Sequence, residues 1–217
     1  MKIRVLVADD HAIIREGLRV MLGNQPDMEV VGTAANGREA VGLVDEHVPD
    51  VVVIDISMPE LNGIEAIAQI LPRHPHIKVI VLSIHETKPY VYRTLKAGAK
   101  GYLIKETAGL EVVDAVRAVY RGERYLSQRI SDLLTDVSFR NLEVSMEVSP
   151  LEQLSPRERE ILQLVAEGKT SQEIAVRLSI SPKTVDTYRS RLMGKIGVED
   201  MAGLVKFAIQ HGVISLE

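Results

Sequence analysis

Short runs of β-branched residues alternate with amphipathic stretches up to about Tyr120, and this alternation restricts the fold more than any other feature. The runs are IRVLVA (Ile3–Ala8), MEVVGTA (Met28–Ala34), VVVI (Val51–Ile54), KVIVL (Lys78–Leu82) and GYLI (Gly101–Ile104). Between them, apolar residues recur every three or four positions, as helices require. Nearly continuous apolar strands separated by helices indicate a parallel sheet covered on both faces. Five such units are too few for a closed barrel, so we predict an open, doubly wound, five-stranded α/β sheet.

Length and composition set the wider limits. The chain has 217 residues, which is enough for two domains. It contains no cysteine, so disulfides and thiolate metal sites are excluded, which suits a reducing cytosol. The start, MKIRVLVADDH, lacks the apolar run of a signal peptide, and no apolar segment is long enough to span a bilayer. We therefore expect a cytoplasmic protein without a membrane partner. Its net charge of -4 argues against a nucleic-acid-binding surface over the whole protein, although local basic patches are compatible with it.

Polar residues follow four of the predicted strands. They are Asp9 and Asp10 after the first strand, Asp55 after the third, Ser83 after the fourth and Lys105 after the fifth. In a parallel sheet these positions share one edge, where open α/β sheets bind ligands. Paired carboxylates suit Mg²⁺, which takes oxygen ligands and works with phosphate. Asp55 could then attack phosphorus as a nucleophile, while Lys105 and Ser83 bind phosphoryl oxygens. A salt-bridge cluster without chemistry is the alternative interpretation.

The last third of the chain has no strand pattern and contains several sequence signals for the start of a helix. SPRE (Ser155–Glu158) and TSQE (Thr170–Glu173) are capping boxes, and Ser181 with Pro182 opens a third helix that runs towards Gly197. A fourth helix is expected from about Asp200 to His211. Four short helices, of which the middle two are separated by only a few residues, form a helix-turn-helix pattern.

The third of these helices combines an apolar face with a basic, hydroxyl-rich face. Val185, Tyr188, Leu192 and Ile196 recur at helical spacing and would face the core. The residues that we predict to contact DNA are Lys183, Thr184, Asp186, Thr187, Ser190, Arg191 and Lys195. Arginine and lysine reach phosphates or guanine edges in the major groove, and Asp186 could accept from a cytosine amino group. A solvated, charged helix face is the ordinary alternative explanation.

Together these motifs resemble a two-component response regulator of the NarL/FixJ type over nearly the whole chain. The receiver signature stands as Asp9-Asp10, Asp55 followed by MPELNG (Met58–Gly63), Ser83, and Lys105. The stretch LSPREREIL…EGKTSQEIAVRLSISPKTVDTYRSRLMGKIG resembles the LuxR-type DNA-binding domain. The resemblance implies a flavodoxin-like receiver over residues 1–121, a linker with one short helix over 122–149, and a four-helix DNA-binding domain over 150–217.

The resemblance also implies roles for individual residues. A sensor histidine kinase would donate a phosphoryl group to Asp55. Mg²⁺ would be held by Asp10, Asp55 and the backbone carbonyl of Ser57, with Asp9 acting indirectly. Ser83 and Tyr102 would move together as the switch that reports phosphorylation to the surface of the receiver.

The output would be regulated binding of promoter DNA. The resemblance implies a homodimer on DNA formed through the last helix, 200–211, and it leaves RNA polymerase open as a further partner. The apolar seam of that helix would comprise Met201, Leu204, Val205 and Ala208. Packing of the seam against its own domain is an equally simple interpretation.

Two other functions stay open. One is a constitutive DNA-binding protein whose receiver serves only dimerisation. The other is a Mg²⁺-dependent phosphatase or phosphotransferase. Such an enzyme would need a second acid two residues after Asp55 as general acid, and Ser57 occupies that position, which argues against this function. We therefore expect no enzyme activity beyond self-directed phosphoryl transfer and autodephosphorylation at Asp55. No histidine is assigned as a metal ligand, although His11 directly follows the paired acids.

Overall fold

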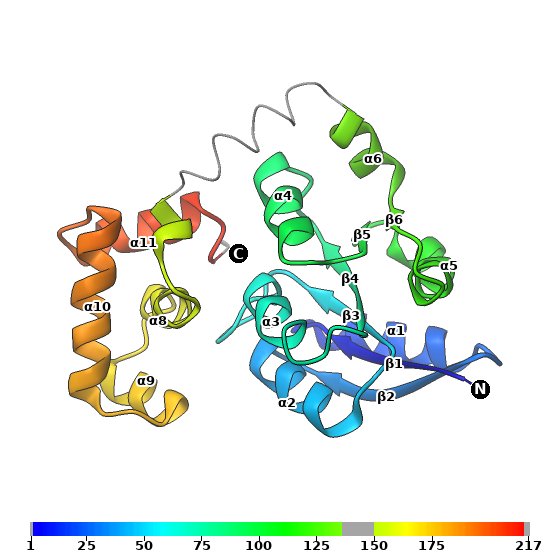
Figure 1. Ribbon diagram of the computed structural model, residues 1–217, viewed down its shortest axis with the longest axis horizontal. Coiled ribbons are helices and arrows are strands. Elements are labelled where there is room, and N and C mark those ends of the chain that lie inside the picture. Colours follow the sequence, from blue (N-terminus) through cyan, green and yellow to red (C-terminus); the bar gives the residue numbers. More distant parts are fainter. Residues whose placement is uncertain (1, 136–149, 215–217) are drawn as a thin grey trace. The chain divides into compact units, whose positions relative to one another are not determined.

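The computed structural model describes residues 2–135 and 150–214. The chain divides into two compact units, Met1–Glu143 and Val144–Glu217, which are described separately (Figure 1). The first unit contains β1 (Ile3–Ala8), α1 (Ala12–Gly23), β2 (Met28–Ala34), α2 (Gly37–His47), β3 (Val51–Asp55), α3 (Gly63–Ile70), β4 (Lys78–Ser83), α4 (Lys88–Lys96), β5 (Gly101–Ile104), α5 (Ala108–Tyr120), β6 (Tyr125–Leu126) and α6 (Gln128–Thr135). The strands form one parallel sheet in the order β2-β1-β3-β4-β5-β6.

Helices cover both faces of this sheet, as the continuous apolar strands predict. Successive residues of a strand point to opposite faces. In β3, Val52 and Ile54 belong to the core that includes residues of α2, α3, α4 and α6. Val51 and Val53 belong to the core on the other face, which α1 and α5 complete. The predicted doubly wound parallel sheet is therefore confirmed.

The sheet has six strands in the described residues, one more than the five predicted. In β6, the Tyr125 amide donates to the Lys100 carbonyl and the Ser127 amide to the Tyr102 carbonyl, both at 3.0 Å. These bonds satisfy backbone groups that β5 would otherwise expose at the sheet edge. Residues 125–135 thus belong to the first unit. They include α6, where we predicted one short helix within a linker over 122–149. The rest of that predicted linker, 136–149, lies outside the described residues.

The second unit contains only helices in its described part. They are the 3₁₀-helix η1 (Pro150–Gln153), α8 (Pro156–Ala166), α9 (Ser171–Leu178), α10 (Pro182–Ile196) and α11 (Met201–Gln210). Ser155 and Thr170 form the two predicted capping boxes. Ser181 caps the start of α10, and Gly197 ends it with a left-handed φ of 70°. Across residues 2–135 and 150–214, no helix is long and apolar enough to cross a membrane.

Val48 ends α2 in a backbone conformation that suits its side chain poorly. Its φ of 44° and ψ of 66° lie in the left-handed region, which β-branched residues rarely adopt. Asparagine tolerates this region, so Val48→Asn is expected to raise the free energy of unfolding by about 1 kcal/mol. Urea titrations would measure the change, with Val20→Asn on the exposed face of α1 as control. Equal effects of the two substitutions would contradict the assignment of strain to Val48.

Candidate functional site

The strand ends bring the predicted acidic residues and lysine together at one edge of the sheet. Lys105 Nζ lies 2.6 Å from Asp55 Oδ2 and 2.9 Å from Asp9 Oδ2. The side chains of Asp9 and Asp55 are 0% and 2% exposed, and that of Lys105 is 9% exposed. A buried carboxylate requires such a partner, because an unpaired buried charge is strongly unfavourable. The pairing explains how the apolar strand β3 can end in an aspartate.

The pKa values of the pair reflect this burial. Burial raises the pKa of Asp55 to about 6, Lys105 opposes the increase, and Asp9 adds to it. Burial alone would lower the pKa of Lys105, but the carboxylates of Asp55 and Asp9 outweigh burial and raise it. Lys105 is therefore a firmly charged ammonium group between two carboxylates.

A cation would find several oxygen donors beside this pair. Ligand atoms of Asp9, Asp10, His11 and Asp55 all lie within 4.8 Å of one another. Asp10 Oδ1 is buried and accepts no hydrogen bond. It lies 2.8 Å from His11 Nδ1, a contact that is an ion pair only when the histidine is protonated. The carboxylate set suits a hard divalent cation, and His11 adds a nitrogen atom that we did not assign to the site.

The loop after Asp55 depends on a glycine. Gly63 begins α3 so close to β3 that an added Cβ atom would lie 2.1 Å from the carbonyl oxygen of Asp55. The Gly63 amide donates to the Ile56 carbonyl at 2.9 Å, and Asn62 caps α3 by accepting from the Glu65 amide. Any other residue at position 63 would displace the end of the strand that carries Asp55.

Arg15 fastens the loop that carries the two acids, and no sequence pattern singled it out. Its guanidinium Nη1 donates to the carbonyl oxygen of Asp9 at 2.6 Å and to that of Asp10 at 3.3 Å. Because each carbonyl adjoins an acidic side chain, Arg15 restricts the positions of both carboxylates.

His85 is a second residue that the sequence interpretation missed. Its Nε2 lies 3.1 Å from Ser57 Oγ, and its amide donates to Ser83 Oγ at 2.9 Å. The hydroxyl of Tyr102, a fully buried residue, donates to the His85 carbonyl at 2.6 Å. The imidazole stacks on the Tyr90 ring with 4.0 Å between centroids. His85 thus joins both predicted switch residues, Ser83 and Tyr102, to the loop after Asp55.

Burial also changes the pKa values of His85 and Tyr102. It lowers the pKa of His85, and the nearby positive charge of Lys105 lowers it further. Burial raises the pKa of the Tyr102 hydroxyl, which therefore stays protonated as a hydrogen-bond donor. The structure does not define a ligand role for the Ser57 carbonyl, which stays a prediction.

The second unit presents most of the predicted DNA contacts on the outer face of α10. Lys183, Asp186, Thr187, Ser190, Arg191 and Lys195 are exposed, and Thr184 is half-buried. Val185 and Leu192, on the opposite face, are fully buried in the core of the unit. The predicted division of this helix into an apolar and a polar face is confirmed, while the contacts with DNA stay predictions.

Two members of that set have partners inside the unit. Asp186 Oδ1 accepts from Ser171 Oγ at 2.6 Å and so links the first turn of α9 to α10. This bond gives Asp186 a structural role beside its predicted contact with a base. Lys195 Nζ lies 2.7 Å from Glu158 Oε2, so a contact between Lys195 and DNA would compete with this ion pair.

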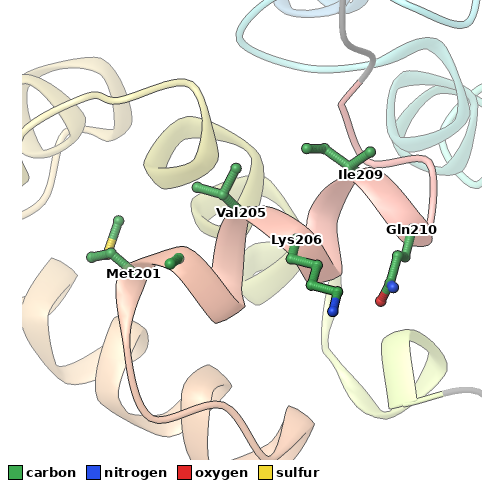
Figure 2. A pocket seen from close by; sticks show the side chains of 6 residues that line it. Met201, Val205, Lys206, Ile209 and Gln210 are labelled. Atoms are coloured by element: carbon green, nitrogen blue, oxygen red, sulfur yellow. The ribbon is translucent and has the colours of Figure 1, made fainter.

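The open face of the last helix keeps only two members of the predicted seam, Met201 and Val205. Leu204 and Ala208 are fully buried within the unit and cannot belong to an intermolecular seam. An open groove instead runs along α11 (Figure 2). Its lining residues are Met201, Ala202, Val205, Lys206, Ile209 and Gln210. Hydrophobic periodicity could not distinguish the buried residues from those of the groove, because apolar residues recur every three or four positions on both faces of α11.

Comparisons with known proteins match both units. Residues 5–117 match the family described as response regulator receiver domain, and residues 152–208 match the bacterial regulatory proteins of the luxR family. The chain is 38% identical over 216 residues to the oxygen regulatory protein NreC of Staphylococcus epidermidis, which covers 97% of this chain and 99% of that protein.

Solved structures give the same result. The structure of the two-component response regulator RcsB bound to DNA is 28% identical with a TM-score of 0.59, covering 95% of this chain and 98% of that one. A structure of two RcsB dimers bound to two parallel DNAs has the same identity, TM-score and coverage. This chain is thus a transcriptional regulator rather than a conventional enzyme, and it belongs to the response regulators of the NarL/FixJ type, which join a receiver domain to a LuxR-type DNA-binding domain.

Proposed function

We propose that a sensor histidine kinase phosphorylates Asp55 and that this modification controls binding of promoter DNA by α10. The single observation that carries the proposal is the position of Lys105 Nζ, in contact with Asp55 Oδ2 and Asp9 Oδ2 at the carboxyl edge of the sheet. A lysine that already bridges the two carboxylates can stay in place while one of them becomes an acyl phosphate.

The chemistry is a direct transfer. A carboxylate oxygen of Asp55 attacks phosphorus, the bond between phosphorus and the kinase histidine nitrogen breaks, and that nitrogen keeps the electron pair. Lys105 pairs with a phosphoryl oxygen, and the Ser83 hydroxyl donates a hydrogen bond to another. Water later hydrolyses the acyl phosphate and restores Asp55, which is the self-directed reaction of the receiver.

Mg²⁺ fits the donors beside Asp55. We propose that Asp10, Asp55 and the Ser57 carbonyl hold the ion, with Asp9 acting indirectly and His11 at the border of the site. When bound, the ion supplies positive charge that offsets repulsion between the Asp55 carboxylate and the phosphoryl oxygens.

The output is proposed to be a homodimer on promoter DNA, with the groove along α11 as the contact between protomers. The RcsB dimers on DNA support this arrangement by likeness. The exposed Met201 and the half-buried Val205 and Ile209 could be covered by the same face of a second copy, as a two-fold axis requires.

The proposal is tested by intact mass and DNA binding measured on the same samples. After incubation with Mg²⁺ and acetyl phosphate, we expect one phosphoryl group per chain and tighter binding to DNA. An adduct without any change in DNA binding would favour the constitutive regulator. Steady turnover of a small phosphate ester would favour the phosphotransferase.

Arg191→Ala is expected to weaken binding to every DNA sequence. Its guanidinium is exposed on α10, so we assign it to a phosphate, and each phosphate contact that is lost reduces the salt slope by about 1. Titrations at several salt concentrations would measure this slope. Arg124→Ala removes the same charge from an exposed position of the first unit and should leave the slope unchanged. An unaltered slope for Arg191→Ala would refute the assignment.

A further inference from the structure

The segment formed by β6 and α6 is hydrogen-bonded to the backbone of Tyr102. Leu126 of β6 pairs with Tyr102 of β5, and the Ser127 amide donates to the Tyr102 carbonyl at 3.0 Å. The Tyr102 hydroxyl, at the other end of the same residue, donates to the His85 carbonyl. One residue therefore connects the loop beside the phosphoacceptor to the strand that precedes α6 (Figure 1).

Side-chain packing makes a second connection. Ile130 of α6 is 0% exposed and belongs to the same core cluster as Tyr102 and Val91, with Leu133 and Leu134 packed against that cluster. The eight residues of α6 that the structure describes are too few to be stable as an isolated helix. Its helical structure therefore depends on its contact with this core.

Arg129 makes a third connection, at the surface. Its Nη1 lies 2.6 Å from Glu86 Oε1 and 3.7 Å from Glu106 Oε2. Glu86 follows His85 and Glu106 follows Lys105, so both partners adjoin residues of the site. The Arg129 side chain is 61% exposed, so the ion pair adds little stability, but its geometry depends on the positions of both loops.

We propose that α6 is the element through which the phosphorylation state of Asp55 reaches the chain that leads to the DNA-binding unit. Ile130 and Arg129 are the positioning residues of this coupling. If the bonds among Ser83, His85 and Tyr102 rearrange, the support of α6 changes, and the helix docks more firmly or detaches. The inference rests on the proposed phosphorylation switch and adds the route of its signal.

Hydrogen exchange of the full chain tests this route, with intact mass recorded on the same samples. On phosphorylation by acetyl phosphate and Mg²⁺, we expect exchange of the α6 amides to change by about tenfold or more, while amides of α2 keep their rates. Arg129→Glu should reduce the response of α6 without lowering the extent of phosphorylation. Combining Arg129→Glu with Glu86→Arg restores the ion pair and should restore the response. A purely structural role would shift the exchange of α6 equally in both phosphorylation states.

Ile130→Ala provides the buried counterpart, and Leu110→Ala, at an 87% exposed position of α5, is its control. We expect Ile130→Ala to leave α6 in fast exchange in both phosphorylation states and the control to respond as the wild type does. An adduct on the wild type with unchanged exchange in α6 overturns the inference but not the proposed function. Failure to form any adduct on the wild type overturns both.

Discussion

Asp55→Asn is expected to abolish incorporation of the phosphoryl group. The amide lacks a carboxylate nucleophile, while its size and shape fit the space beside Lys105. The fold should survive, because the pKa of Asp55 is raised to about 6 in the folded protein, so that its ionisation at neutral pH costs folding free energy that a neutral amide does not cost. Intact mass after incubation with acetyl phosphate measures the loss, and urea titration measures the stability.

The matched control is Asp45→Asn, which removes an exposed carboxylate from α2 and should keep full incorporation. An adduct on Asp55→Asn would show that another residue accepts the phosphoryl group, and peptide mapping would then locate it.

Lys105→Met is expected to lower the stability of the first unit by about 3 kcal/mol when no divalent cation is present. The substitution leaves the buried carboxylates of Asp9 and Asp55 without their shared cation. Saturating Mg²⁺ should raise the stability of the variant more than that of the wild type, because the ion faces a more negative site. Exchange of the slowest amides in the sheet, measured in chelator and in Mg²⁺, reports this unit alone.

Lys105→Arg keeps the charge and should lose less stability than Lys105→Met. Lys206→Met, at an exposed site of α11, should have no effect on the sheet amides. If Lys105→Met is as stable as the wild type in chelator, the two carboxylates do not depend on the lysine.

The sheet and the acidic edge could be predicted because burial on both faces leaves a direct mark on the sequence. All five residues of β3 are buried, so VVVI is continuous where a half-exposed strand would alternate. Asp9, Asp55 and Lys105 come together only through the parallel topology, which the alternation of strands and helices already implies.

Features set by tertiary contacts could not be predicted in this way. With two residues, β6 is too short for any periodicity, and it exists because β5 offers free backbone groups. His85 is a single histidine in a loop, and only its spacing of two residues from Ser83 hinted at a role. The ion pair between Lys195 and Glu158 joins residues 37 positions apart, which no local charge pattern can show.

The two ends of α10 are fixed by its own sequence, with Ser181 accepting from the Thr184 amide and Gly197 in the left-handed region. The helix that would enter the major groove therefore exists before DNA arrives. Association with DNA requires no transition from coil to helix in α10, so folding of this helix adds nothing to the heat-capacity change of binding. Encounter can then proceed at a rate set by electrostatic steering and orientation instead of by ordering of the chain.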